Sequence, residues 1–194
     1  MKTTFLTLLA SHLFAVCIGL SLTPEAAAQM YVGGAYGVSD SRASSDSVPE
    51  MEGDAGYRVN LGNQLSNTFS FEVAYVDLGS YVVGTIDGQS DLSESSDQLD
   101  INGYELAVIG KLPLRKKLSL FARLGLFAWD GERVIVDVDN TQPSIFASSD
   151  EDVSVGLGVE MEFLDHMGIV LEANQYKTED VYNQLYGLGV YFTF

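Results

Sequence analysis

The chain has 194 residues, and its 10 Lys+Arg against 27 Asp+Glu give a formal net charge of −17 at pH 7. This acidity argues against nucleic-acid binding, because the phosphate backbone is repelled, and the single Cys17 excludes a disulfide framework or cysteine-rich metal site. The 10 Tyr, 10 Phe, 19 Gly and 4 Pro favour β structure, and the length fits one domain.

The N-terminus has the pattern of a secretory signal peptide. Lys2 precedes an apolar run from Phe5 to Leu22, and small residues follow at 26–28. This pattern predicts a cleaved signal over residues 1–28 and a mature domain over residues 29–194. Two alternatives are a membrane anchor made by the same run and a lipoprotein built on Cys17, which the bulky Val16 before it disfavours.

Beyond the signal, the dominant pattern is strict alternation of apolar with small or polar residues. No later apolar run is long enough for a membrane-spanning helix, so an exported chain of this kind is soluble or a β-barrel. Strands of about ten residues suit a tilted crossing of a bilayer. We expect the apolar face to meet lipid and the small, polar face to line a narrow lumen. The alternation predicts eight strands, within residues 30–38, 57–62, 69–76, 104–109, 120–126, 153–163, 169–174 and 186–194.

The connections between these strands alternate in length. Short turns are expected at 63–67, 113–117 and 164–167, and longer loops at 39–55, 80–100 and 130–151, with a shorter fourth connection on the loop side at 177–180. Tight turns on one side and long loops on the other are typical of an outer-membrane barrel. The prediction is an all-β, eight-stranded antiparallel up-and-down transmembrane β-barrel, present as a monomer. The runs 81–83 and 134–136 are candidates to extend their strands above the membrane.

Four segments resemble strands of the OmpA transmembrane-barrel family. They are residues 31–37, residues 71–75 followed by Asp77-Leu78-Gly79, residues 121–125 followed by Trp129, and residues 158–160. The chain ends at its last strand, so the resemblance is to the small members without a periplasmic peptidoglycan-binding domain. It implies the outer membrane of a Gram-negative bacterium, with outer-membrane lipid and lipopolysaccharide as surroundings.

The C-terminal strand resembles the signal that the barrel-assembly machinery reads. Phe194 ends the chain, Phe192 lies two positions earlier on the same face, and Gly187 and Gly189 alternate with the apolar residues. The resemblance therefore implies that machinery as a partner during insertion. The alternative is the ordinary last strand of a soluble sandwich.

Charged residues on the predicted inward face need partners, because an unpaired charge in a dry lumen is costly. The resemblance implies that Glu72, Arg123 and Glu160 belong to an interior ion-pair network, which in the family plugs the barrel. Ile109 and Val170 stand where the family has basic residues, which favours a structural network over a gated pore. Further charges share the inward face: Arg58, Glu105, Lys111, Glu162 and Glu172.

The sequence carries no convincing catalytic or metal-binding arrangement, and we predict neither an enzyme nor a cofactor. Only His166 remains after the signal, in a predicted periplasmic turn, which disfavours a lipid A-modifying enzyme that depends on histidine. The acidic loops are explained by solubility, with divalent-cation binding as the alternative. A structural or surface-interaction protein is therefore favoured over a narrow channel for ions or small solutes. A surface ligand cannot be named.

Overall fold

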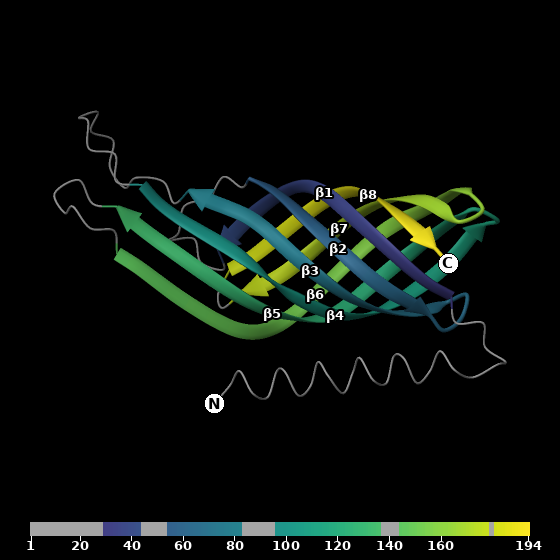
Figure 1. Ribbon diagram of the computed structural model, residues 1–194, viewed down its shortest axis with the longest axis horizontal. Coiled ribbons are helices and arrows are strands. Elements are labelled where there is room, and N and C mark those ends of the chain that lie inside the picture. Colours follow the sequence, from purple (N-terminus) through teal and green to yellow (C-terminus); the bar gives the residue numbers. More distant parts are fainter. Residues whose placement is uncertain (1–28, 44–53, 83–95, 137–143, 179–180) are drawn as a thin grey trace.

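The computed structural model describes residues 29–43, 54–82, 96–136, 144–178 and 181–194. Neighbouring strands pair in chain order, and β1 pairs with β8 to close an antiparallel barrel (Figure 1). The predicted fold is confirmed. The predicted signal peptide, residues 1–28, lies outside the described residues. The strands are β1 (Gln29–Ala43), β2 (Ala55–Gln64), β3 (Phe69–Val82), β4 (Ser96–Arg115), β5 (Leu118–Val136), β6 (Ser144–Leu164), β7 (Met167–Thr178) and β8 (Val181–Thr193).

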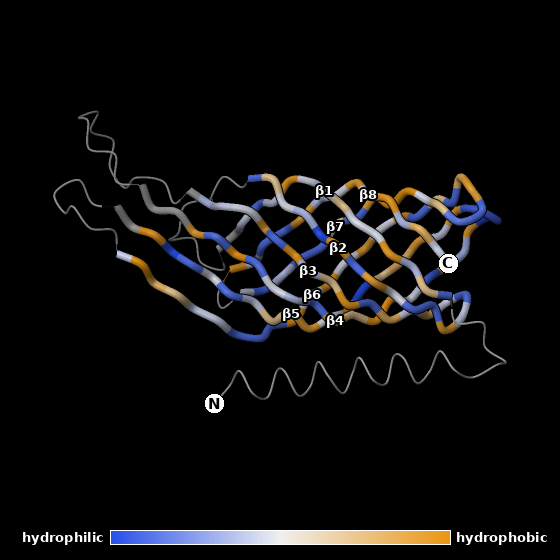
Figure 2. The backbone as a smooth tube through the Cα atoms, in the orientation of Figure 1, coloured by the Kyte–Doolittle hydropathy of each residue, from blue (hydrophilic) through white to orange (hydrophobic). Residues whose placement is uncertain are grey.

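The alternation of the sequence becomes the two faces of the barrel wall. Leu157 and Leu188 point outward and are 66 % and 63 % exposed, while Arg58 points inward and is 2 % exposed. Hydrophobic and hydrophilic positions follow one another along the strands of the barrel body (Figure 2). No helix among the described residues is long and apolar enough to cross a membrane.

Aromatic residues mark the outer wall near both ends of the apolar band, as the aromatic girdles of membrane barrels do. Tyr36 lies opposite Tyr57, and the ring centroids of Tyr75 and Tyr104 are 5.4 Å apart, so tyrosines form a continuous row across β1 to β4. Phenylalanines occupy the opposite end, where Phe69, Phe163, Phe192 and Phe194 are exposed.

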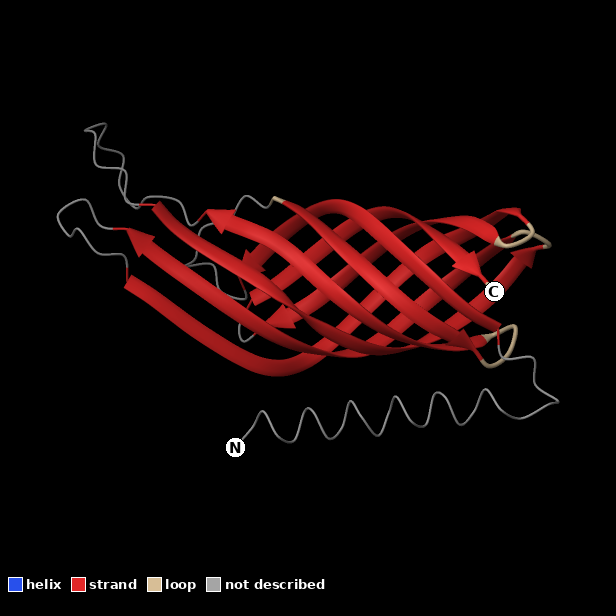
Figure 3. Ribbon diagram, viewed as in Figure 1, coloured by secondary structure: helices blue, strands red, loops and turns tan. Residues whose placement is uncertain are grey.

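The two ends of the barrel differ in their connections (Figure 3). At one end, which we call the turn end, short turns join β2 to β3, β4 to β5 and β6 to β7. Gln29 and Phe194 lie at the same end, where the Phe194 N–H donates to the Met30 carbonyl at 2.9 Å. The opposite end, which we call the loop end, carries three longer connections, from β1 to β2, from β3 to β4 and from β5 to β6, and corresponds to the cell-surface side of such barrels. The connection from β7 to β8 is as short as a turn, because β7 continues to Thr178 and β8 begins at Val181.

Several strands are longer than the predicted ten residues, and the loops are correspondingly shorter. β4, β5 and β6 have 20, 19 and 21 residues. The predicted loop 130–151 is therefore wrong over most of its length, because β5 continues to Val136 and β6 begins at Ser144. Strands above the membrane have no side that faces lipid, so their apolar and polar residues need not alternate. The sequence pattern therefore did not reveal these strand extensions. The predicted extensions at Tyr81-Val82 and at 134–136 are confirmed.

A β-bulge interrupts β3 at the Asp77-Leu78-Gly79 segment, where its register with β4 shifts. Gly79 has a φ of +76°, a conformation that a residue with a side chain rarely adopts. The Asp77 carboxylate accepts the Gly79 N–H at 2.9 Å, and Leu78 is fully buried. The motif is thus a local device that redirects the strand beyond the tyrosine row.

The interior is not lined only by the small and polar residues expected from the sequence. One apolar cluster includes Phe127, Trp129, Tyr176 and Leu185 and lies toward the loop end. A second, toward the turn end, consists of Ala107, Ile109 and Phe121, with Val170 packed against it. An eight-stranded lumen is just wide enough for side chains to fill it, so large apolar residues serve inside as well as outside.

Candidate functional site

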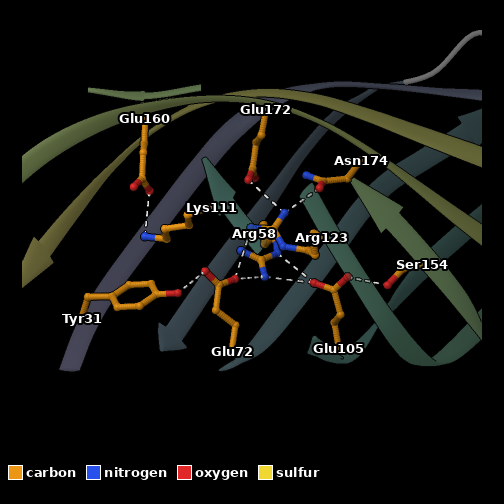
Figure 4. A network of polar contacts seen from close by, with 10 residues as sticks. All are labelled: Tyr31, Arg58, Glu72, Glu105, Lys111, Arg123, Ser154, Glu160, Glu172 and Asn174. Carbon is orange, nitrogen blue, oxygen red and sulfur yellow. Dashed lines mark hydrogen bonds and ion pairs between the residues drawn. The ribbon is translucent and has the colours of Figure 1, made fainter. Parts of the chain in front are cut away.

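Five charged side chains from five strands meet inside the barrel (Figure 4). Each comes from an inward position of its strand, and each is at most 6 % exposed. We call this group the lumen network: Arg58 of β2, Glu72 of β3, Glu105 of β4, Arg123 of β5 and Glu172 of β7.

Arg58 joins two of the carboxylates. Its Nη2 lies 2.5 Å from Glu72 Oε2, and its Nε donates to Glu105 Oε2 at 3.0 Å. Charge-assisted hydrogen bonds of this kind are the strongest that side chains form. Arg58 was predicted only as an inward charge, and the structure places it at the centre of the group.

Arg123 contacts Glu72 from the other side and extends the network to β7. Its Nη2 lies 3.2 Å from Glu72 Oε2, and its Nη1 lies 3.0 Å from Glu172 Oε2. The same Nη1 donates to Asn174 Oδ1 at 2.5 Å. Glu72 is therefore shared between both guanidinium groups and links them.

Neutral side chains hold the outer oxygens of the carboxylates. The Tyr31 hydroxyl donates to Glu72 Oε1 at 2.7 Å, and the Ser154 hydroxyl donates to Glu105 Oε1 at 2.5 Å. Gly62 makes the first contact possible, because a Cβ there would lie 2.1 Å from Cζ of the Tyr31 ring. A Cβ at Gly125 would likewise lie 2.5 Å from the Ser154 hydroxyl. Gly62 and Gly125 thus leave room for the side chains of Tyr31 and Ser154.

Each strand that contributes a charge also contributes apolar residues above or below it. Along β5, Phe121 lies toward the turn end of Arg123, and Phe127 and Trp129 lie toward its loop end. Along β4, Glu105 lies between Ile101 and the pair Ala107 and Ile109. The network is therefore a polar layer between two apolar layers, in a setting where ion pairs are poorly screened and an unpaired charge is costly.

Glu160 pairs with Lys111 rather than with Arg123. Lys111 Nζ lies 3.0 Å from Glu160 Oε2, and both side chains are more exposed than those of the lumen network. Glu162 follows two positions later on the same face of β6 and is half-buried. The second apolar cluster, which contains Ile109 and Val170, lies between this pair and the network. The apolar residues at those positions therefore divide the inward charges into two groups.

Hydrogen bonds also fill the interior near the loop end. The Ser39 hydroxyl bonds to the Tyr81 hydroxyl, the Ser41 hydroxyl bonds to Asn183, and Asn183 Nδ2 donates to Thr178 Oγ1 at 2.8 Å. All five side chains are buried. Side chains from β1, β3, β7 and β8 thus meet across the interior above the first apolar cluster.

Tyr31, Ser154 and Asn174 belong to the site but were not predicted as part of it. Their parity along the strands is the same as that of the inward charges, and this was the available signal. Parity shows which residues face the lumen, but it does not show which residues of distant strands meet there. The contact between Tyr31 and Glu72 spans 41 positions in the sequence.

The residues of the predicted assembly signal lie on both faces of β8 and at Phe194 directly after it. Phe192 and Phe194 point outward and are 44 % and 68 % exposed. Gly187 and Gly189 are buried on the inward face. A Cβ at Gly189 would lie 2.3 Å from the Gly34 carbonyl oxygen, so this glycine permits a close approach of β8 to β1.

Groups suited to catalysis are not gathered in the described part of the chain. His166 lies in the exposed turn between β6 and β7. No group of three or more His, Cys, Asp or Glu residues among the described positions could hold a metal ion. The acidic residues of the segments 44–53, 83–95 and 137–143 lie outside the described residues, as does any cation site they form.

The comparisons with known proteins agree on one architecture. Residues 10–194 match the family model of the outer membrane protein beta-barrel domain. Ail, the attachment invasion locus protein of Yersinia pestis, superimposes with a TM-score of 0.60 at 14 % identity, over 86 % of this chain and 99 % of Ail. Neisserial surface protein A gives 0.59 at 14 % identity, over 85 % and 97 %.

A third similar structure is a major outer membrane protein of Thermus thermophilus. It gives a TM-score of 0.53 at 13 % identity, over 87 % of this chain and 100 % of that protein. At such identities the likeness shows the fold alone. A comparison with curated protein sequences finds no match.

Proposed function

Because the chain belongs to the outer membrane protein beta-barrel family, we propose that it is a non-enzymatic barrel of the Gram-negative outer membrane whose lumen is plugged and whose role is exercised at the cell surface. The lumen network is the observation that best supports a plugged lumen. Arg58 and Arg123 bridge carboxylates from three strands across the interior. A solute crossing the barrel would have to part these pairs and the apolar layers on both sides.

A narrow channel is the competing function. Eight strands leave an interior that side chains can fill completely. Phe127 and Tyr176, with ring centroids 4.8 Å apart, fill it on the loop side of the network. The geometry therefore supports a closed barrel in which charged side chains stabilise the wall.

The surface role is supported by the loop end. β4, β5 and β6 carry described structure well beyond the tyrosine row that marks the membrane boundary. One of the similar structures is Ail in complex with the heparin analogue sucrose octasulfate. A polyanion does not fit the loop end of this chain, because the parts of β4 to β6 beyond the tyrosine row are strongly acidic and would repel it.

Planar-bilayer conductance of the purified protein tests the plug. We expect no steady conductance for the wild type. The variant Arg58→Ala with Arg123→Ala, Phe121→Ala and Phe127→Ala removes both cations of the network and one ring from each apolar layer, and it should conduct. Gel mobility serves as the folding control. If the variant is folded, its unheated sample should migrate differently from its boiled sample, because a closed barrel resists unfolding by detergent. Steady wild-type conductance would show that the lumen is open.

We further propose that Phe194 and Phe192 are read by the barrel-assembly machinery. Both side chains are exposed on the outer wall of the last strand, where they contribute little to the interior. Phe194→Ser should therefore slow insertion in cells while refolding in detergent proceeds as in the wild type. Equal loss in both settings would indicate a structural role only.

A further inference from the structure

β4, β5 and β6 continue past the loop end of the barrel as one sheet, and the end of β3, Ser80 to Val82, pairs with residues 98–100 of β4. We call it the protruding sheet: residues 96–102, 130–136 and 144–152. β5 and β6 pair along its whole length, up to Ile135 opposite Ser144. β6 pairs with β7 only from Ser154 onward, where Ser154 lies opposite Tyr176. Within the described part of the chain, residues 144–152 therefore have a neighbouring strand on one side only (Figure 1).

The backbone directions along this edge follow from one hydrogen bond. Glu162 of β6 donates its N–H to the Lys117 carbonyl on the β5 side. N–H and C=O groups alternate in direction along an antiparallel strand, and the β5–β6 register is continuous from Leu118 to Ile135. Even-numbered residues of β6 therefore bond toward β5, and odd-numbered residues present their backbone groups to the open edge.

Three of these odd-numbered residues have backbone groups that are available to hydrogen-bond an added strand: Ile145, Ala147 and Ser149. The N–H of the fourth, Glu151, is held by the Asp150 carboxylate at 2.9 Å. Residues 144–150 are all exposed. Ile145 and Phe146, which point to opposite faces of the sheet, are 61 % and 59 % exposed. An exposed strand edge with large apolar side chains is a template for another strand.

Charge indicates what kind of strand fits. The protruding sheet contains seven acidic residues and only one basic residue, Arg133. Asp150 and Glu151 lie at the membrane-proximal end of the open edge, and the apolar pair lies at its outer end. Opposite charges across a strand pair stabilise it, and like charges destabilise it.

We propose that the open edge of β6 binds an extended polypeptide segment of another protein as an added antiparallel strand. The segment would carry Lys or Arg in its N-terminal half, opposite Asp150 and Glu151. Its C-terminal half would carry β-branched or aromatic residues, opposite Ile145 and Phe146. Main-chain hydrogen bonds to Ile145, Ala147 and Ser149 would provide affinity, and the side chains would provide selection. This inference rests on the surface role proposed above.

A second copy of this chain is a poor occupant of the edge. Two copies in one membrane point in the same direction across it, so their β6 edges would meet as parallel strands. Asp150 and Glu151 would then lie beside the same residues of the other copy, and like charges would face each other. An acidic peptide fails for the same reason.

The test uses the protein purified from outer membranes and placed in phosphatidylcholine nanodiscs. The probe is the fluorescent peptide Thr-Lys-Arg-Thr-Thr-Thr-Ile-Val. As an antiparallel strand it places Lys and Arg opposite Glu151 and Asp150, and Ile and Val opposite Phe146 and Ile145. Binding is followed by anisotropy. A peptide with Glu in place of Lys and Arg should bind at least about tenfold more weakly, since a few cross-strand charge pairs together reach that factor. The same peptide in reversed order should also bind more weakly, because only a parallel strand would then match the charges.

Ala147 offers a matched pair of variants. Proline at 147 removes an edge-facing N–H, but it leaves the bonds toward β5 intact and is tolerated on an edge strand. Ala147→Pro should lower affinity at least about tenfold, whereas Ala147→Val should keep it, because valine preserves the N–H and favours a strand. Hydrogen exchange should show new protection of the amides of Ile145, Ala147 and Ser149 when peptide is bound.

The inference is overturned if no probe binds, if Ala147→Pro binds as the wild type does, or if the acidic peptide binds equally. A concentration-dependent dimer that Ala147→Pro abolishes would identify a second copy as the occupant instead. Conductance of the same nanodisc preparation, measured after fusion to a planar bilayer, tests the plug separately. An open lumen with intact peptide binding would refute the plug and leave the docking edge standing.

Discussion

Strands β4 and β5 pass through two regions in which charged residues have opposite environments. In the lumen, Arg123 and Glu105 are buried and bonded to charges of the opposite sign. In the protruding sheet, the same two strands carry an excess of acidic residues, and β6 beside them is exposed from Ser144 to Glu151 except for its bonds to β5. Solvent explains the difference, because water screens like charges that a dry interior would not tolerate.

The comparison shows that pairing and exposure must be considered together when a charge is given a role. In the lumen, a charge contributes to the fold only through its partner. In the protruding sheet, charges leave the stability of the barrel almost unaffected. They instead determine which charged polypeptides can bind. Substitutions in the two regions should therefore differ in size and in the property that they change.

The largest effect is expected at Arg123. Replacing it with methionine leaves Glu172 and Asn174 without their guanidinium partner, and the free energy of unfolding should fall by about 3–5 kcal/mol. The double variant Arg123→Met with Glu172→Gln should cost less than the sum of the two single changes. Urea-induced unfolding in lipid vesicles measures both. Strictly additive losses would mean that water screens the lumen network.

The outer wall should give the next largest effect. Leu157 is exposed in the middle of β6, so Leu157→Arg should lower the free energy of unfolding by about 2–4 kcal/mol near the bilayer midplane. Leu157→Met at the same site should change it little and serves as the control. Vesicle unfolding at several bilayer thicknesses would locate the midplane. A fully stable arginine variant would contradict the assigned lipid face.

A smaller effect is expected at the turn end, where the ion pair of Lys111 and Glu160 is closer to solvent than the lumen network. Lys111→Met should lower the free energy of unfolding by about 1 kcal/mol or less. High salt should lower the free energy of unfolding of the wild type toward that of the variant, because salt screens partly exposed ion pairs. A loss as large as that of Arg123→Met would mean that the turn end of the lumen is as dry as its centre.

The smallest effect on stability is expected in the protruding sheet. The double variant Asp150→Asn with Glu151→Gln should change the free energy of unfolding by no more than about 0.5 kcal/mol. It should nevertheless reduce binding of the basic probe peptide. Stability and binding measured on the same preparation separate the two regions. A large loss of stability would show that this edge is part of the fold.

Much of the site could be predicted because parity along a strand decides which wall a residue faces. Glu72, Arg123 and Glu172 were assigned inward from alternation alone, and the structure buries all three. The pairing of Glu160 with Lys111 could not be predicted in this way, since it depends on how far neighbouring strands are staggered. The large interior residues Phe127 and Trp129 share the parity of Arg123 and were detectable. They were missed because apolar residues were expected to face lipid.

The sequence by itself determined the number of strands, the two faces of the wall and the end that carries short turns. Those properties follow from local alternation and turn chemistry, which act over a few residues. Tertiary structure alone decided that Tyr31 contacts Glu72 and that an apolar layer separates Lys111 from Arg123. It also decided that β6 extends beyond the end of β7. Those properties depend on the closure and stagger of the whole barrel, which bring together residues that are distant in the chain.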